Sequence, residues 1–305
     1  MGVCEAAERE FVDKYQYASL TKAVADKASP LRQYLEQRFP NTAGFRSEYR
    51  ARSWDLLAGG GETRTSGTVG TAFDLMVRLL LDGSYVPHEP RLGVIGATYL
   101  DVVDEVIDIA HASLRAGSDD TFIRACWALA LCAELYRAPS VFRRSALWEL
   151  HANGTFVDID LLGLAPDAAI QDLRTLQKVA DERLFPFLRP PYFLGPSFDG
   201  SVLCPADADF IAAGSLIDIK TQVGTKNAKG IRTDNLKNEQ LYQVLAYVLF
   251  DRTDSYGITS FGIYSARYGN LTVWPVSSGF EALAGERLDI RSERETVWRL
   301  LGGRR

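Results

Sequence analysis

Residues 206–222 read ADADFIAAGSLIDIKTQ, two segments of alternating apolar and polar residues that meet at Gly214. Such alternation is typical of short strands, and a glycine between two of them favours a tight antiparallel turn. If Ala213 and Gly214 form the turn, Phe210 pairs with Ile217, and we expect this apolar face to lie toward the core. The stretch therefore predicts a β-hairpin with one apolar face and one acidic face.

The same register places two carboxylates against each other on the acidic face of the hairpin. Asp209 stands opposite Asp218, and Asp207 stands opposite Lys220. Like charges at directly opposed positions destabilise a sheet, so the carboxylate pair needs a physical reason. A divalent cation between the two is the simplest one, and Lys220 would then project beside the metal and a bound phosphate. The alternative is an exposed polar face with a salt bridge between Asp207 and Lys220.

The composition is that of a soluble globular chain, with 47% hydrophobic and 24% charged residues among 305. No apolar run approaches the roughly 20 residues of a membrane span, and the acidic N-terminus is unlike a signal peptide. We therefore expect no membrane partner and a cytoplasmic location. Four cysteines without a CxxC motif indicate free thiols in a reducing compartment. A net charge of −5 counts mildly against a protein that binds phosphates.

The histidines indicate which metals the chain can bind. Only three are present, His88, His111 and His151, and they form neither an HxH nor an HExxH pattern. A zinc site is therefore not expected. Any bound metal should be a hard cation held through oxygen, Mg²⁺ or Mn²⁺.

The hydrophobic periodicity changes near residue 150 and predicts two regions. Residues 1–150 are expected to be mainly helical, with a flexible loop at 62–70 and helices over 72–81, 98–116 and 121–137. Residues 151–305 begin with FVDIDLLGL, a strand or a short loop, and end in a helical tail over 280–301. Between these we expect helices over 167–184 and 236–250, and strands over 192–198, 206–212, 215–222, 258–268 and 271–276. This order predicts an α/β (α+β) fold, a central mixed sheet flanked by helices.

The acidic hairpin and the helix after it resemble the PD-(D/E)XK nuclease superfamily, particularly its RecB-like branch. In that family an Asp near the end of one strand is followed, one hairpin later, by Asp or Glu, any residue, and Lys. Here these are Asp209 and then Asp218-Ile219-Lys220. The family then has a helix with Gln, three residues and Tyr, here Gln243 and Tyr247. The resemblance implies a restriction-endonuclease-like core within residues 151–305, and it leaves residues 1–150 unexplained.

The resemblance also implies an activity and roles for these residues. The chain would hydrolyse phosphodiester bonds of DNA, with Mg²⁺ or Mn²⁺ bound by Asp209 and Asp218. Lys220 would assist the attacking water. Gln243 and Tyr247 would align the active site or contact nucleic acid, as would Gln240, one helical turn earlier. The plainer alternative for these last residues is the polar rim of an ordinary packing helix.

Other candidates surround this set without a motif that fixes them. The family places a Glu on a helix before the sheet as a further metal ligand, for which Glu134 is the first candidate and Glu149 the second. Each could equally be a structural salt-bridge partner. Lys226, Lys229 and Arg232 lie in one loop and could hold DNA phosphates, although such a loop is more often merely solvated.

Three functional hypotheses stay open. The first is an active Mg²⁺-dependent deoxyribonuclease in DNA repair, restriction or phage defence. The second is a catalytically weak module that keeps the nuclease fold for nucleic-acid binding or assembly. The third is another phosphoesterase or a structural protein, which Gln243 and Tyr247 would favour if they faced away from the acids. No GxxxxGK[ST] motif occurs, so a protein partner would have to supply any motor or targeting function. The sequence does not decide the oligomeric state.

Overall fold

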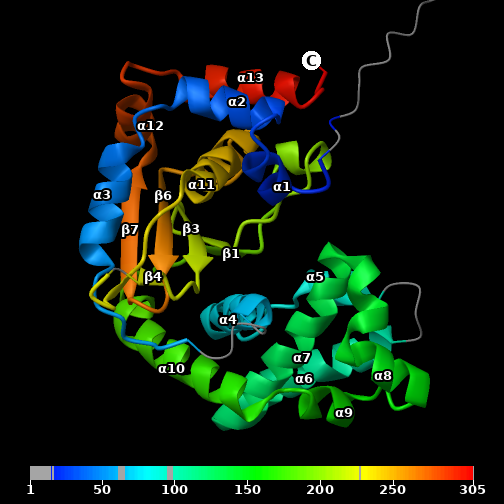
Figure 1. The fold of residues 1–305 in the computed structure, drawn as a ribbon. Helices are drawn as coiled ribbons and strands as arrows, with labels where there is room; N and C mark the ends of the chain where they lie inside the picture. Colours follow the sequence, from blue (N-terminus) through cyan, green and yellow to red (C-terminus); the bar gives the residue numbers. More distant parts are fainter. Residues whose placement is uncertain (1–14, 16, 61–65, 95–98, 227, 305) are drawn as a thin grey trace, which may run out of the picture.

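The computed structural model describes residues 15, 17–60, 66–94, 99–226 and 228–304, which form a mixed sheet with helices on both faces (Figure 1). None of the described helices is long and apolar enough to cross a membrane. The helices are α1 (Leu20–Ala25), α2 (Pro30–Arg38), α3 (Ala43–Arg52), α4 (Ser66–Leu81), α5 (His88–Gly93), α6 (Leu100–Ala116), α7 (Asp119–Arg137), α8 (Ala146–Asn153), α9 (Asp158–Gly163), α10 (Asp167–Arg183), α11 (Asn238–Phe250), α12 (Val276–Ala284) and α13 (Ile290–Leu300). The strands are β1 (Tyr192–Leu194), β2 (Phe210–Ala212), β3 (Ser215–Lys220), β4 (Thr225–Lys226), β5 (Arg232–Thr233), β6 (Ser260–Ser265) and β7 (Asn270–Pro275).

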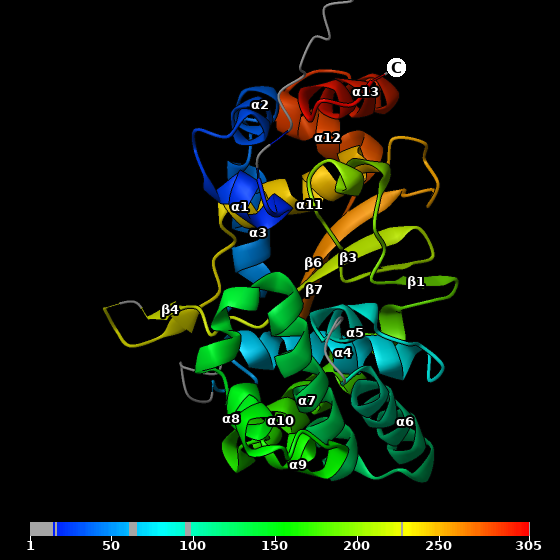
Figure 2. The same cartoon turned by 90° about the vertical axis from the view of Figure 1, so that its right-hand side faces the viewer.

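The main sheet has five strands in the order β1-β2-β3-β6-β7. β1, β2 and β3 pair antiparallel, β3 and β6 pair parallel, and β6 and β7 pair antiparallel. A parallel pair needs a crossover connection, and the segment between β3 and β6 supplies it with α11. The short strands β4 and β5 form a separate ribbon within the same connection (Figure 2).

The predicted hairpin register is confirmed. Phe210 pairs with Ile217 and Ala212 pairs with Ser215 across β2 and β3. Ala213 and Gly214 form the turn with positive φ angles of 46° and 79°, as a two-residue turn that follows the twist of the strands requires. β2 itself begins only at Phe210, so the acids before it lie just beyond the paired strand.

Both faces of this hairpin are buried, so the alternative of an exposed polar face does not hold. Phe210 and Ile217 join a core with helices α4 to α10. Ile211 and Leu216, on the acidic face, join a second core that includes α1–α3 and α11–α13. β3 lies in the middle of the sheet, and a strand with a parallel neighbour is normally covered on both sides. Asp218 is therefore buried together with the apolar residues of its own face.

The helices before residue 150 are divided between the two faces of the sheet. α1–α3 contribute to the core that contains α11–α13, whereas α4, α6, α7 and α8 pack into the other core with α9 and α10 (Figure 1). The boundary expected near residue 150 falls inside α8.

The expected loop at 62–70 ends earlier than the sequence suggested, because α4 begins at Ser66. Gly70 therefore lies inside a helix. A Cβ at this position would lie 3.0 Å from Thr221 Oγ1, just after β3, so the glycine lets α4 approach the end of that strand.

Most of the segment 156–164 forms the short helix α9, Asp158–Gly163, so the expectation of a strand or loop was wrong. Val157 and Ile159 suggested a strand because they alternate with aspartates. Leu161 and Leu162 are buried in the helical core, and this tertiary packing outweighs the local β propensity. The C-terminal tail is likewise two helices, α12 and α13.

A buried ion pair fixes the chain just after β3. The Arg267 guanidinium contacts both carboxylate oxygens of Asp172 on α10, each at 2.7 Å. The Nε atom of Arg267 donates to the Thr221 carbonyl at 2.6 Å, and Nη1 donates to the Gly59 carbonyl at 2.9 Å. One arginine thus joins α10, the end of β3 and the segment before α4.

We expect Arg267→Ala to lower the free energy of unfolding by about 3–5 kcal/mol, because it leaves a buried carboxylate without its cation. Arg124→Ala is the matched control, since Arg124 pairs with the exposed Asp120, and it should cost less than about 1 kcal/mol. Urea unfolding followed by circular dichroism measures both. Equal costs for the two variants would contradict this role for Arg267.

Candidate active site

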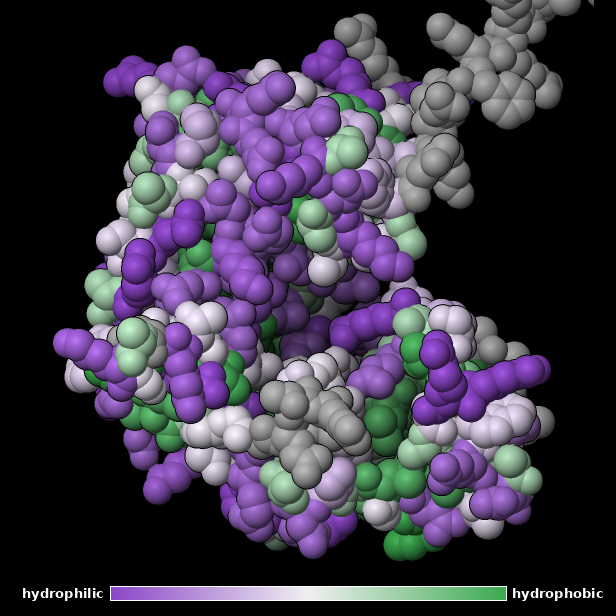
Figure 3. All heavy atoms as spheres, viewed as in Figure 1, coloured by the Kyte–Doolittle hydropathy of each residue, from purple (hydrophilic) through white to green (hydrophobic). Residues whose placement is uncertain are grey.

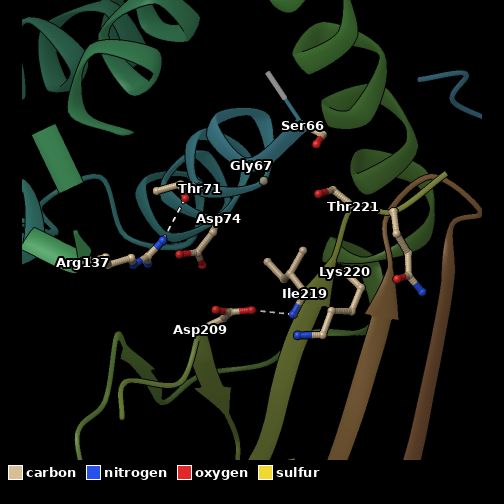
Figure 4. A pocket seen from close by; sticks show the side chains of 11 residues that line it. Ser66, Gly67, Thr71, Asp74, Arg137, Asp209, Ile219, Lys220 and Thr221 are labelled. Atoms are coloured by element: carbon tan, nitrogen blue, oxygen red, sulfur yellow. Dashed lines mark hydrogen bonds between the residues drawn. The ribbon is translucent and has the colours of Figure 1, made fainter. Parts of the chain in front are cut away.

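A cavity of about 410 Å³ opens where β3 ends, between the strand and the first turns of α4 (Figure 4). Four charged residues line it: Asp74, Arg137, Asp209 and Lys220. The space-filling view shows the molecule hollowed between the half that holds the sheet and the half built from α4–α9, with hydrophilic residues at the rim (Figure 3). A cavity lined by several convergent charged groups is a candidate binding site.

Asp218 and Lys220 form an ion pair at the end of β3. Lys220 Nζ lies 2.7 Å from Asp218 Oδ2 and donates to Gln243 Oε1 at 3.3 Å. The Asp218 side chain is buried, and the Lys220 ammonium is the charged partner of its Oδ2 atom. Burial raises the pKa of Asp218 to about 6, although the Lys220 ammonium acts in the opposite direction. Among the described residues Lys220 has no salt bridge with Asp207, so the alternative of an exposed Asp207–Lys220 pair does not hold.

The Asp209 carboxylate reaches across the hairpin to β3. Its Oδ2 atom accepts a hydrogen bond from the Ile219 backbone N–H at 2.5 Å, so the carboxylate lies between Asp218 and Lys220 in register. The Asp209 carbonyl accepts from the Gly195 N–H at 3.0 Å, which anchors the residue from the other side. Asp209 also lines the cavity, whereas Asp218 lies behind the lining.

Gln243 and Tyr247 on α11 face the acids. Gln243 Nε2 donates to the Tyr247 hydroxyl at 2.8 Å, and this hydroxyl donates to the Asp207 carbonyl at 3.0 Å. Burial raises the pKa of Tyr247 well above its usual value, so the hydroxyl keeps its proton. The hydrogen bonds run from Asp207 through Tyr247 and Gln243 to Lys220, and they fix the position of the ammonium.

Gln240 lies one turn earlier on the same side of α11. Its Nε2 atom donates to Gln222 Oε1 at 3.1 Å, and its Oε1 atom accepts from the Lys237 N–H at 2.9 Å. Gln222 in turn donates to Asp234, which is fully buried. Gln240 therefore connects the start of α11 to the segment that follows β3.

Sequence reasoning missed Asp74 on α4. This buried aspartate lines the cavity together with Asp209 (Figure 4). Its two carboxylate oxygens accept from Arg78 Nε at 3.0 Å and from Nη2 at 2.5 Å. Burial raises the pKa of Asp74, Arg78 opposes the rise, and Asp209 adds to it. The signal in the sequence was an Asp and an Arg four residues apart within the otherwise apolar AFDLMVRLLL.

The structure does not bring Glu134 or Glu149 to the cavity. The Glu134 carboxylate accepts a hydrogen bond from Thr68 Oγ1 on α4 at 2.5 Å, and Glu134 is not among the residues that line the cavity. Glu149 is exposed on α8. The face of α7 that holds Glu134 packs on the first turn of α4, which places Asp74, not Glu134, beside Asp209.

The basic loop forms the β4–β5 ribbon, which projects from the body of the molecule (Figure 2). Lys226 and Lys229 are exposed on it. Arg232 is half-buried and donates to the Gly224 carbonyl at 3.0 Å. None of the three lines the cavity, so any phosphate contact they make would lie outside it.

The donor set fits a hard cation better than zinc. Within the described ranges, no three His, Cys, Asp or Glu side chains are close enough to form a complete metal site. Asp209 and Asp218 nevertheless lie together, since each carboxylate is close enough for Asp209 to raise the pKa of Asp218, and both are oxygen ligands. Mg²⁺ is commonly held by one or two carboxylates, with substrate phosphate and water completing its shell. The residues present fit that mode of binding.

Comparison of the chain with models of protein families, with curated proteins and with solved structures gave no match.

We expect Tyr247→Phe to lower the free energy of unfolding by about 1–3 kcal/mol, because it leaves buried polar partners unsatisfied. Tyr256→Phe is the matched control: the Tyr256 hydroxyl also donates to a carbonyl, that of Ser197, but is exposed. That control should cost less than about 1 kcal/mol. Denaturant unfolding measures the free energy of unfolding of both variants. If Tyr247→Phe lowers it no more than the control does, Tyr247 is not tightly held.

Proposed function

We propose that this protein is a divalent-metal-dependent nuclease that hydrolyses phosphodiester bonds of DNA, with a restriction-endonuclease-like core of the PD-(D/E)XK type. One observation supports the proposal above the others. Asp209, Asp218 and Lys220 of the hairpin come together with Gln243 and Tyr247 of α11, beside the cavity that Asp209 and Lys220 line. The packing of a structural protein does not require this convergence of two carboxylates, an ammonium and an amide.

In this proposal Asp209 and Asp218 hold Mg²⁺ or Mn²⁺. Asp74 is a further oxygen donor at the same cavity, from a helix before the sheet, the place where Glu134 was expected. A bound divalent cation would lower the pKa of a water molecule and neutralise charge on the phosphate. Arg78 donates to both oxygens of Asp74, which fixes the position of that carboxylate at the edge of the cavity.

Lys220 acts in this proposal as a cation and a hydrogen-bond donor. Burial alone would lower its pKa, but the carboxylates of Asp218 and Asp209 raise the pKa above its usual value. The ammonium therefore stays protonated at neutral pH and suits the stabilisation of negative charge that develops on a phosphate. Gln243 accepts a hydrogen bond from it and limits its freedom to turn away.

We expect metal-dependent cleavage of DNA by the wild type, abolished by EDTA and lowered on the order of a hundredfold or more in Lys220→Ala and Asp218→Asn. Lys178→Ala, which removes an exposed ammonium on α10, should cleave normally. Linear and circular substrates with Mg²⁺ or Mn²⁺ provide the assay. Wild-type binding to DNA without cleavage would instead favour a module that only binds nucleic acid.

We expect Gly67→Leu to block the cavity. A Cβ at Gly67 meets no atom within 4 Å and Gly67 lines the cavity, so we expect a larger side chain there to occupy part of the cavity. Cleavage should fall on the order of a hundredfold, because a small displacement of substrate costs that much. Gly44→Leu on α3 is the control, since its Cβ also meets nothing and lies outside the cavity. Normal cleavage by Gly67→Leu would show that the substrate binds elsewhere.

A further inference from the structure

Arg137 reaches the cavity from the last turn of α7, on the opposite side from Lys220 (Figure 4). Its Nη1 atom donates to Thr71 Oγ1 on α4 at 2.8 Å. The side chain is exposed, so the guanidinium is open to a molecule that enters the cavity. No element of the proposed reaction described so far uses it.

The Arg137 guanidinium forms no ion pair with a carboxylate of the described residues. Across the described part of the chain, no Asp or Glu oxygen lies within 4 Å of this guanidinium, although Lys220 pairs with Asp218 and Arg78 pairs with Asp74. Thr71 is neutral and takes one of the five N–H donors. The other donors can bind an anion without breaking an ion pair.

Each side of the cavity has one acid and one base, and Asp74, the acid on the α4 side, is paired with Arg78 rather than with Arg137. Asp209, with Asp218 behind it, lies where β3 ends, and Arg137 lies across the opening beside α4. An arginine guanidinium suits phosphate because its parallel N–H groups match two phosphate oxygens. Phosphates repeat along a nucleic-acid strand. One phosphate can therefore bind a metal while a neighbouring phosphate binds an arginine.

We propose that Arg137 is a substrate-binding residue that holds a phosphate of the DNA strand next to the phosphate at Asp209 and Asp218, with Thr71 orienting the guanidinium. This inference rests on the proposed function for the identity of the substrate. The competing explanation is that Arg137 only complements the negative end of the α7 dipole. That explanation predicts a small loss of stability and unchanged DNA binding.

The test compares Arg137→Gln with Arg144→Gln, a matched removal of an exposed arginine outside the cavity. Both changes are made in the Lys220→Ala chain, so that DNA labelled with a fluorophore stays intact in Mg²⁺. Anisotropy gives the dissociation constant over a range of salt concentrations. We expect Arg137→Gln to weaken binding roughly tenfold to a hundredfold and to reduce the salt dependence by about one phosphate contact. Arg144→Gln should bind like its parent.

In the chain with Lys220 intact, Arg137→Gln should raise KM for DNA more than it lowers kcat, and Arg137→Lys should restore part of the affinity. Equal binding by the Arg137→Gln and Arg144→Gln chains, or no binding by the parent, would overturn the inference. The outcome for the nuclease is separate. If Arg137→Gln weakens DNA binding but the wild type does not cleave DNA, the proposed phosphate site stands and the proposed nuclease activity is contradicted. If Arg137→Gln cleaves DNA with the KM of the wild type, the nuclease proposal stands and the proposed role of Arg137 in substrate binding is contradicted.

Discussion

The contact between the Asp218 carboxylate and the Lys220 ammonium, 2.7 Å apart, lies on a strand that is covered on both faces by apolar cores. Neither core offers the water that a charge would otherwise bind, and an unpaired buried charge is expensive. The residues around the pair are therefore constrained. Gln243 must face the ammonium, and α11 must present that side to the sheet. Asp209 stabilises the backbone between the two charges by accepting from the Ile219 N–H. The apolar packing of α11 against the sheet thus also brings an amide to the charges that the helix covers.

The helices on the opposite face are joined to the same site by a second buried charge. Arg78 on α4 is almost fully buried and contacts Asp74 and Glu89. A Cβ at Gly195 would lie 2.5 Å from Arg78 Nη1, so this glycine leaves room for the guanidinium beside the end of β1. The Gly195 N–H in turn donates to the Asp209 carbonyl. Arg78 therefore links Asp74 on α4 to Asp209 on the hairpin. A shift of α4 would change the positions of both carboxylates.

The parts of the site that sequence could predict are those specified locally. The register of the hairpin follows from alternation and a two-residue turn, and the direction of Gln243 and Tyr247 follows from helical spacing after an expected strand. Asp74 could not be found in this way, because its approach to Asp209 depends on how α4 packs on the sheet, which involves contacts distant in sequence. The same holds for the covering of both faces of β3, since local alternation does not show which helices return to a given face. Glu134 was chosen for its position at the end of an apolar helix, but an acid at a helix end can be satisfied by a neighbouring hydroxyl, as Thr68 does here.

The buried Asp218 oxygen bears on the choice between an enzyme and a module that only binds or assembles. Desolvation of a buried ion pair costs stability, and apolar replacements of such pairs are often neutral or stabilising. A protein that needed only the fold could dispense with this pair. A divalent cation would add a second positive partner to the buried Asp218 carboxylate and would also change the charge of the cavity, whose two lining acids balance its two lining bases. With a net charge of −5, the chain has no general attraction for DNA, so the charge that binds phosphate must be local. A metal beside Asp218 and the uncommitted guanidinium of Arg137 would together supply it where the strand has to bind.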